Sequence, residues 1–247
     1  GQRIEGHRLK DEMDGQTFRA QIKEQVLPSS ISVTFDPTVS SVDNKLLNGH
    51  YKFDNEGIRA QRVNAVENGI LKQFLMSRTP LDNFVHSNGH GRSSPGVRTV
   101  SRQSNLIVES TKSSSMEELR KLLIRECRRQ DRKYGYLFRD VMGGFTNTDR
   151  VTPNAFNIFP TEVYRIFADG RPDELVRGVD LIGTPLAMFA EIMATGTERE
   201  VFNGFCGAES GQVPVSALSP ALFVKRIETQ KKPTTLQDTT LLSRPTN

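Results

Sequence analysis

The dipeptide Asn68-Gly69 lies between two short apolar runs, and this feature limits the fold more narrowly than any other part of the sequence. The run before it is RVNAVE and the run after it is ILKQFLM. Asn-Gly supplies the two positive φ angles of a type I′ turn, which joins adjacent antiparallel strands. The sequence therefore predicts a β-hairpin over residues 63–76.

Most of the remaining chain also has the pattern of short strands bounded by turn residues. We expect strands over residues 31–35, 51–53, 105–110, 134–141, 155–160 and 221–227, and a second hairpin formed by 162–170 and 174–183. Two helices are predicted. One follows the capping box Ser115 to Glu118 and runs to about Gln130; the other follows Thr184-Pro185 and ends near Gly196. The predicted fold class is α+β, with mostly antiparallel or mixed β-sheets and two covering helices.

Composition restricts the functional classes. No apolar run approaches the ~18 residues of a membrane span, and there is no signal-like start, so we expect a soluble protein. The formal charge is only +4, and the densest basic group lies in the first helix at residues 120–133. Without interleaved aromatics or a phosphate loop, a solvated helix face is favoured over direct nucleic-acid binding. Two distant cysteines favour a reducing, cytoplasmic compartment.

Cys206 has the surroundings most typical of chemistry. It follows the apolar run 201–205 and precedes a glycine-rich run, so we expect a strand to end at the thiol and tight turns to follow. A thiol on a loop held by a rigid scaffold is typical of a metal ligand or a nucleophile. A buried structural cysteine is the equally weighted alternative. Cys127 lies on the apolar stripe of the first helix, which favours a structural role.

The histidines do not by themselves define a site. Four of them are candidate bases beside a cysteine, and the sequence places none of them near Cys206: His7, His50, His86 and His90. The spacing of His86 and His90 suits two zinc ligands on a helix, but Ser-Asn-Gly between them is turn sequence. Residues 78–102 form a long Ser-, Gly- and Asn-rich loop. We expect its His90 and Arg92 to form the lip of a substrate groove; a plain flexible loop is the equal alternative.

Several longer segments occur in a fixed order: EGHRLKDEMDGQTF, DNEGIRAQRVNAVENGILKQFLMSRTP, SNGHGR, SRQSNLIVES, GGFT, DGRPDELVRGVDLIGTPLAMF and FNGFCGAESGQVPVS. This series resembles the C-terminal half of the TldD/PmbA family, also called modulators of DNA gyrase, over residues 1 to about 229. The resemblance implies a C-terminal-type domain over 1–229, with a central-region remnant at 1–110. From 230 to 247 the composition predicts a disordered tail.

In the TldD branch, the resemblance implies a zinc metallopeptidase acting on peptides and unfolded proteins. A His-Glu-x-x-x-His helix supplies two zinc ligands, and a cysteine in a Cys-Gly turn, matched by Cys206, supplies the third. Such a zinc keeps one open position for a water, and lowers the pKa of that water enough to provide hydroxide. The glutamate is then the general base that takes the proton of the water.

The chain departs from this pattern at its first residues. Gly1-Gln2 stands where the family has Gly-His, so the first histidine and the general-base glutamate are expected upstream of residue 1, and no catalytic residue is assigned within the chain. Gln2, a neutral amide, is a poor zinc ligand. His7 is the candidate replacement, so the metal ligands named here are Cys206 and His7, in an incomplete zinc site.

Two functions of different class follow. The retained Cys206 favours the C-terminal portion of a TldD-like zinc metallopeptidase, which contributes one ligand and a peptide groove. Gln2 favours the alternative, a non-catalytic PmbA-like subunit that binds peptide or a partner without metal. In either case the expected partners are an extended peptide, added to an exposed strand edge, and a second family member in a homodimer or heterodimer.

Overall fold

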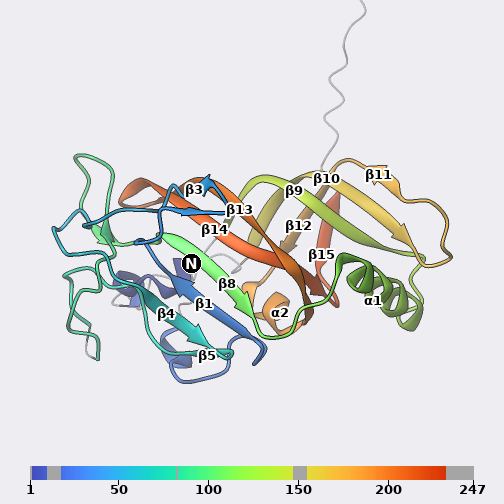
Figure 1. Cartoon of the computed structure of the whole chain (residues 1–247), viewed down its shortest axis with the longest axis horizontal. Helices are drawn as coiled ribbons and strands as arrows, with labels where there is room; N and C mark the ends of the chain where they lie inside the picture. Colours follow the sequence, from blue (N-terminus) through green and yellow to red (C-terminus); the bar gives the residue numbers. More distant parts are fainter. Residues whose placement is uncertain (1, 10–17, 82, 147–154, 232–247) are drawn as a thin grey trace, which may run out of the picture.

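The computed structural model of the 247-residue chain describes residues 2–9, 18–81, 83–146 and 155–231. Two β-sheets lie next to each other along the long axis of the molecule, and a single long helix flanks the second sheet (Figure 1). The predicted α+β class, with mostly antiparallel strands and two helices, is confirmed.

The first sheet has six strands in the order β13-β14-β8-β1-β4-β5. All neighbouring strands are antiparallel except β14 and β8, which are parallel. The strands are β1 (Ile31–Phe35), β4 (Val63–Glu67), β5 (Ile70–Leu71), β8 (Asn105–Ser110), β13 (Ile192–Ala208) and β14 (Gly211–Val224). Strands β13 and β14 form the longest hairpin, and β13 is an edge strand of this sheet.

The second sheet is antiparallel and is built around β10, which pairs with β9, β11 and β12. Strand β15 pairs with β12. The strands of this second sheet are β9 (Tyr134–Thr146), β10 (Phe156–Phe167), β11 (Glu174–Val176), β12 (Val179–Gly183) and β15 (Glu228–Lys231). Two further pairs are β2 (Ser41–Val42) with β3 (Lys45–Leu46), and β6 (Gly91–Arg92) with β7 (Val100–Ser101).

The helices are α1 (Met116–Arg129) and α2 (Pro185–Ala190), and the 3-10 turns are η1 (Gln2–Ile4), η2 (Gly6–Leu9) and η3 (Arg19–Gln21). The predicted capping box begins α1, because Ser115 Oγ accepts from the Glu118 backbone N–H and the Glu118 carboxylate accepts from the Ser115 N–H. Helix α1 packs against β9 and β13. Within the described residues, no helix has the length and apolar character to cross a membrane.

The Asn68-Gly69 turn is confirmed: Asn68 has φ 50° and Gly69 has φ 81°, and Val66 pairs with Leu71. A Cβ at Gly69 would lie 2.2 Å from the carbonyl oxygen of Leu27, so only glycine fits there. The second strand is shorter than predicted and ends at Leu71. Beyond Leu71 the chain leaves the hairpin, and Leu75 forms main-chain hydrogen bonds with the N-terminal segment, residues 2–9.

The contact between the N-terminal segment and residues 74–76 forms one edge of the main hydrophobic core. Gly6 N–H donates to the carbonyl of Leu75 at 2.8 Å, and Leu75 N–H donates to the carbonyl of Ile4 at 2.9 Å. Ile4 and Leu9 are buried with side chains of β1, β4 and β5 and of residues 74–76. The N-terminal segment is therefore fixed to the first sheet by both main-chain bonds and apolar packing.

Two predicted strand boundaries are wrong because glycine and proline do not interrupt the long strands β9 and β14, and one helix boundary is wrong because β13 begins early. Strand β9 continues through Gly143-Gly144, and residues 221–224 of the strand expected over 221–227 are the end of β14, which begins at Gly211; residues 225–227 are not in a strand. Helix α2 ends at Ala190, and the residues up to Gly196 belong to β13.

Two further expectations concern short or terminal segments. The strand expected over 51–53 is only an isolated bridge from Phe53 to Arg59. Gln230 and Lys231, which we assigned to the disordered tail, end β15. The rest of that tail lies outside the described residues.

Candidate metal site at the tip of the β13–β14 hairpin

The N-terminal segment lies against the tip of the β13–β14 hairpin. The amide nitrogen of Gln2 is 3.7 Å from Cys206 Sγ, and it donates a hydrogen bond of 3.2 Å to the carbonyl of Gly207. The family resemblance implies that Gln2, at the position of a ligand histidine, and the ligand cysteine Cys206 lie at one site, although they are far apart in the sequence. The structure brings these two residues together.

Cys206 lies within a strand, which corrects the expectation that the strand ends at the thiol. Strand β13 continues to Ala208, and Cys206 pairs with Val213 of β14. Of the hairpin's glycines near the tip, Gly211 has a positive φ, at 82°, and opens β14 after the turn. The thiol is therefore held by a strand pair, half-buried, with its sulfur accepting from the amide of Gln103 at 3.2 Å.

His7 is close to this tip but bonds to a carboxylate of the hairpin turn. Its Nε2 donates to Glu209 Oε1, and Arg8 Nη2 donates to Glu209 Oε2 at 2.7 Å. The hydrogen bond from His7, helped by the charge of Arg8, lowers the pKa of Glu209 to about 2 despite partial burial. The His7 ring nitrogen that faces the tip is therefore already occupied.

Arg102 connects the hairpin tip to the N-terminal segment, and it was not identified from the sequence. Its side chain is fully buried, at 0% exposure. Its guanidinium donates to the carbonyls of Cys206 at 2.5 Å and Gly211 at 3.0 Å, and to Ser210 Oγ at 2.6 Å. Its Nε lies 3.3 Å from Glu5 Oε1. One guanidinium thus fixes both sides of the turn and ties it to the N-terminal segment.

Glu5 is the buried counter-charge of this network. Its side chain is fully buried, and Arg8 Nε donates to its Oε2 at 3.1 Å. Burial raises the pKa of Glu5, whereas the charges of Arg102 and Arg8 lower it. Arg102 and Gln103 both belong to SRQSNLIVES, one of the segments that carried the family resemblance, and this was the signal that could have identified them.

His90 and Arg92 lie behind the tip, beneath the surface. His90 is fully buried, its ring nitrogens hydrogen-bond to the Asn88 carbonyl and to Ser104 Oγ, and burial lowers its pKa to about 4. Arg92 donates to the carbonyls of Gln103 and Pro214. Both side chains hydrogen-bond to residues 103–104, and Gln103 in turn contacts the sulfur of Cys206. Their predicted contact with substrate stays a prediction.

The other two histidines lie elsewhere. His50 Nδ1 lies 2.9 Å from the carbonyl of Pro37, and His86 is exposed on its loop. Among the described residues, no three His, Cys, Asp or Glu side chains are grouped as a metal site would require. Gln2 directs its NH2 group, a hydrogen-bond donor, toward the sulfur. These residues therefore supply one sulfur ligand and do not fit a complete zinc site.

Comparison with solved structures first defines the class of fold. The chain is similar to a putative modulator of DNA gyrase from Thermotoga maritima, with a TM-score of 0.63 and 20% identity, over 92% of this chain and 45% of that one. It is also similar to TldE from Thermococcus kodakarensis, with a TM-score of 0.62 and 17% identity, at the same coverage. Identities this low show a shared fold alone.

Sequence comparison then identifies the family. Residues 4–231 match the model of the PmbA/TldA metallopeptidase C-terminal domain, and the chain belongs to this family. A metalloprotease of Archaeoglobus fulgidus is 30% identical over 208 residues, which is 84% of this chain and 44% of the relative. A metalloprotease TldD homolog of Buchnera aphidicola is 24% identical over 90% of this chain and 44% of the relative. The chain thus spans less than half the length of these relatives, and the resemblance inferred from its sequence is confirmed.

Proposed function

We propose that this chain is the C-terminal part of a metallopeptidase that cleaves peptides or unfolded proteins, and that Cys206 is the sulfur ligand it contributes to zinc. The observation that carries the proposal is the 3.7 Å separation of the Gln2 amide and Cys206 Sγ. Gln2 stands where the family resemblance places a ligand histidine, so the fold has the geometry for a shared site at this point. The metalloprotease names of the relatives support the class of reaction.

In this proposal the chain's own residues position the sulfur and leave the remaining ligands to other residues. Arg102 fixes the carbonyl of Cys206, and Gln103 directs an amide to its sulfur. His7, the predicted second ligand, would have to leave Glu209 to reach a metal. Because one sulfur does not make a zinc site, we assign no catalytic step to this chain.

The outer edge of β13 is the proposed peptide groove. None of the described strands pairs with it, and its open stretch lies between Gly196, which bridges to Ser114, and Gly207, whose carbonyl accepts from Gln2. Phe202 and Phe205 beside it are 44% and 70% exposed. An extended peptide that adds to this edge would form main-chain hydrogen bonds, which tolerate many sequences, and would cover these rings. His90 and Arg92 would support the groove from behind.

The non-catalytic alternative rests on one specific observation. The Gln2 amide donates to the carbonyl of Gly207 and faces the sulfur with the same nitrogen, as a hydrogen-bonding residue does and a metal ligand does not. In this alternative the chain binds peptide, or a family member in a homodimer or heterodimer, without metal. The TldE likeness supports a fold shared by both kinds of subunit. Free Cys127 and Cys206 support a reducing, cytoplasmic location for either.

The test is a gain of metal binding in the full-length protein. We expect Gln2→His to bind Zn²⁺ at least about tenfold more tightly than the wild type, because it restores a nitrogen ligand beside Cys206. Cobalt substitution gives a readout that does not depend on activity, since a thiolate ligand produces a sulfur-to-cobalt absorption band.

The cysteines provide matched controls. Adding Cys206→Ser to Gln2→His should abolish both the gain and the absorption band, whereas adding Cys127→Ser should preserve them. A gain that survives Cys206→Ser would refute the ligand assignment. If the wild type carries one zinc per chain and digests unfolded casein, it is a peptidase; if it is folded and holds no zinc, the partner-subunit alternative is supported.

A further inference from the structure

A cavity of about 630 Å³ opens between the C-terminal end of α1, the start of β9 and the link from β14 to β15. This volume is within the range of roughly 300–1,000 Å³ that small-molecule sites occupy. Val224 lines the cavity, whereas Val213 on the same strand pairs with Cys206, so the length of β14 between them is roughly 35 Å. The cavity is therefore separate from the hairpin tip, which lies toward the other end of the molecule (Figure 1).

One wall of the cavity is an aromatic ladder on β9. Tyr134, Tyr136 and Phe138 are alternate residues, so they project from the same face of the strand. Their ring centroids are 5.4 and 5.7 Å apart, and all three side chains are only partly buried. Further apolar contacts come from α1 and from the β14–β15 link: Leu123, Val224 and Ile227. A flat or aliphatic molecular body would find apolar surface here.

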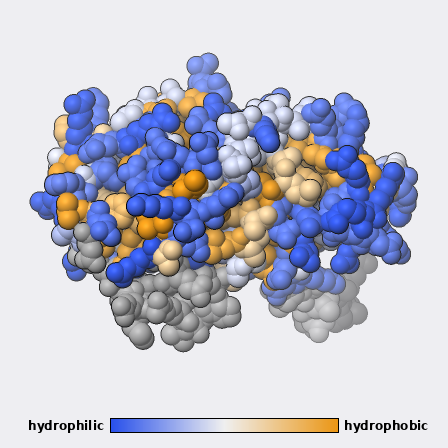
Figure 2. Space-filling view, turned by 90° about the horizontal axis from the view of Figure 1, so that it is seen from below, coloured by the Kyte–Doolittle hydropathy of each residue, from blue (hydrophilic) through white to orange (hydrophobic). Residues whose placement is uncertain are grey.

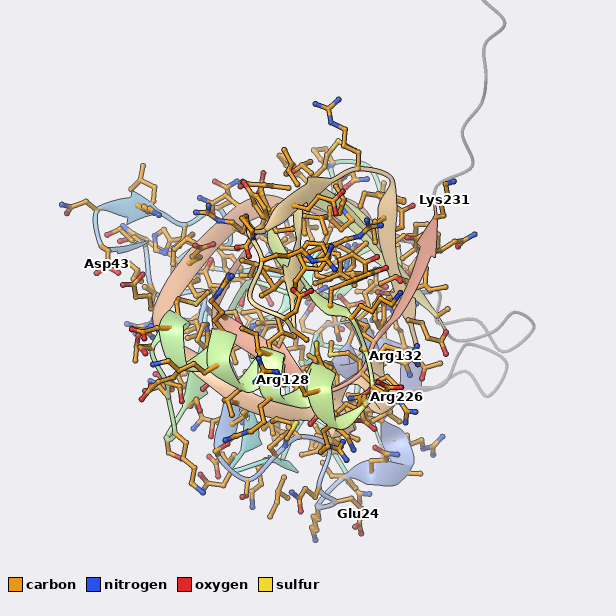
Figure 3. The ribbon with its side chains drawn as sticks, turned by 90° about the vertical axis from the view of Figure 1, so that its right-hand side faces the viewer. Glu24, Asp43, Arg128, Arg132, Arg226 and Lys231 are labelled. Carbon is orange, nitrogen blue, oxygen red and sulfur yellow. The ribbon has the colours of Figure 1, made fainter. Side chains whose placement is uncertain are left out.

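The rim of the cavity is basic. Four cationic side chains line it: Arg132, Lys133, Lys225 and Arg226. In Figure 3, Arg132 and Arg226 lie close together at the end of α1, although they come from different segments. Figure 2 shows mainly hydrophilic residues over this end of the molecule. Among the described residues, Arg132, Lys133 and Lys225 form no ion pair.

The two acidic residues of the lining offset only part of the charge of the four cationic side chains. They are Glu126 and Asp131. The Glu126 carboxylate already accepts from Arg129 and Gln130, each at 2.6 Å. These bonds, helped by the charges of Arg129 and Lys225, lower its pKa to about 2. The C-terminal end of a helix carries a partial negative charge, and this is the end of α1 that lies at the cavity. Any attraction for an anion must therefore come from the basic side chains rather than from the backbone of α1.

We propose that this cavity binds a small amphipathic anion, with an aromatic or aliphatic body on the β9 ladder and a carboxylate, sulfonate or phosphate facing Lys133 and Lys225. Both parts of the ligand have their counterpart in the lining: half-buried rings that still expose apolar surface, and two lysines that form no ion pair among the described residues. A basic surface without a cavity would attract anions but would not select for an apolar body.

The test is a titration of the full-length protein with 1-anilinonaphthalene-8-sulfonate, followed by fluorescence and by calorimetry for stoichiometry. We expect one site per chain that weakens with salt. The double variant Lys133→Ala/Lys225→Ala should weaken binding about five- to tenfold, which is roughly 1–1.4 kcal/mol for the two partly exposed charges together. The matched variant Lys45→Ala/Lys52→Ala removes two lysines that lie outside the cavity, and it should bind like the wild type.

A second pair of measurements tests the apolar wall. Tyr136→Ala should weaken binding of the dye, provided that the circular dichroism spectrum shows the variant to be folded, and the uncharged analogue N-phenyl-1-naphthylamine should bind more weakly than the sulfonate. Equal affinity for the two dyes, an equal loss in both lysine pairs, or several equivalent dye sites per chain would overturn the proposal. Cys206→Ser should leave dye binding unchanged, which separates this result from the metal experiment.

Discussion

Replacing Arg102 with methionine (Arg102→Met) should lower the free energy of unfolding by about 3–5 kcal/mol, the usual cost of breaking a buried ion pair by removing one partner. Methionine keeps much of the volume but none of the donors. The carbonyls of Cys206 and Gly211 and the hydroxyl of Ser210 would each lose the guanidinium. Among the described residues, Glu5 would keep its bond to Arg8, in a position with no solvent exposure.

The assay is urea unfolding followed by far-UV circular dichroism, for the wild type, Arg102→Met, Glu5→Gln and the double variant. Because the two charges compensate each other, the double variant should lose clearly less than the sum of the single variants. A loss below about 1 kcal/mol in Arg102→Met, or strict additivity, would refute the argument that this pair organises the hairpin tip.

The pH dependence supplies a second check on the same pair. Burial raises the pKa of Glu5, and Arg102 opposes that rise, so the pKa should be higher still in Arg102→Met. A carboxyl group with a raised pKa in the folded state stabilises the fold at low pH, and this contribution is lost as the pH rises through the folded pKa. The deficit of Arg102→Met should therefore be smaller at pH 5 than at pH 8, and a deficit that does not change with pH would contradict this.

Three other substitutions test the framework of the fold, each by urea unfolding. Glu209 has its pKa lowered to about 2, so its stabilisation is present above its ordinary pKa of 4.5 and is lost as the pH falls through 2; Glu209→Gln should be less stable than the wild type at pH 6, and the difference should shrink below pH 4.5 and disappear only near pH 2. Gly69→Ala should cost about 2 kcal/mol or more, from a positive φ and a clash with the carbonyl of Leu27. Ser115→Ala should cost about 1 kcal/mol by removing the cap of α1, whereas Ser113→Ala, which lies before the cap, should cost far less.

Local rules predicted the elements whose chemistry is local. The turn at Asn68-Gly69 requires positive φ angles, and the cap of α1 requires a hydroxyl three residues before a glutamate, so both could be predicted from neighbouring residues alone. The length of β13 could not, because Gly204 and Gly207 stay extended through pairing with β14. Tertiary hydrogen bonds overrode the local preference of glycine for turns.

The candidate site likewise contains some residues that could be predicted from the sequence and others that could not. Cys206 was found from its position and from the family resemblance, and that resemblance also led to Gln2 across the whole length of the chain. Arg102 was missed because a buried arginine has no local sequence pattern: its partners are carbonyl oxygens and a carboxylate that only the fold brings together. His90 was predicted to lie on a loop at the lip of a substrate groove, and the structure instead buries its ring completely.

A metal at this tip would link the N-terminal segment to the β13–β14 hairpin, and the chain already makes that link without one. His7 pairs with Glu209 of the hairpin turn, and Glu5 pairs with Arg102, which in turn donates to the carbonyl of Cys206 in the hairpin. The amide of Gln2 adds a neutral bond to the carbonyl of Gly207. Because these contacts fix the N-terminal segment to the hairpin tip, the tip keeps its structure with a glutamine, rather than a histidine ligand, at position 2. The geometry of the site and its ability to bind metal are therefore separable, and Gln2→His combined with Cys206→Ser tests the second without disturbing the first.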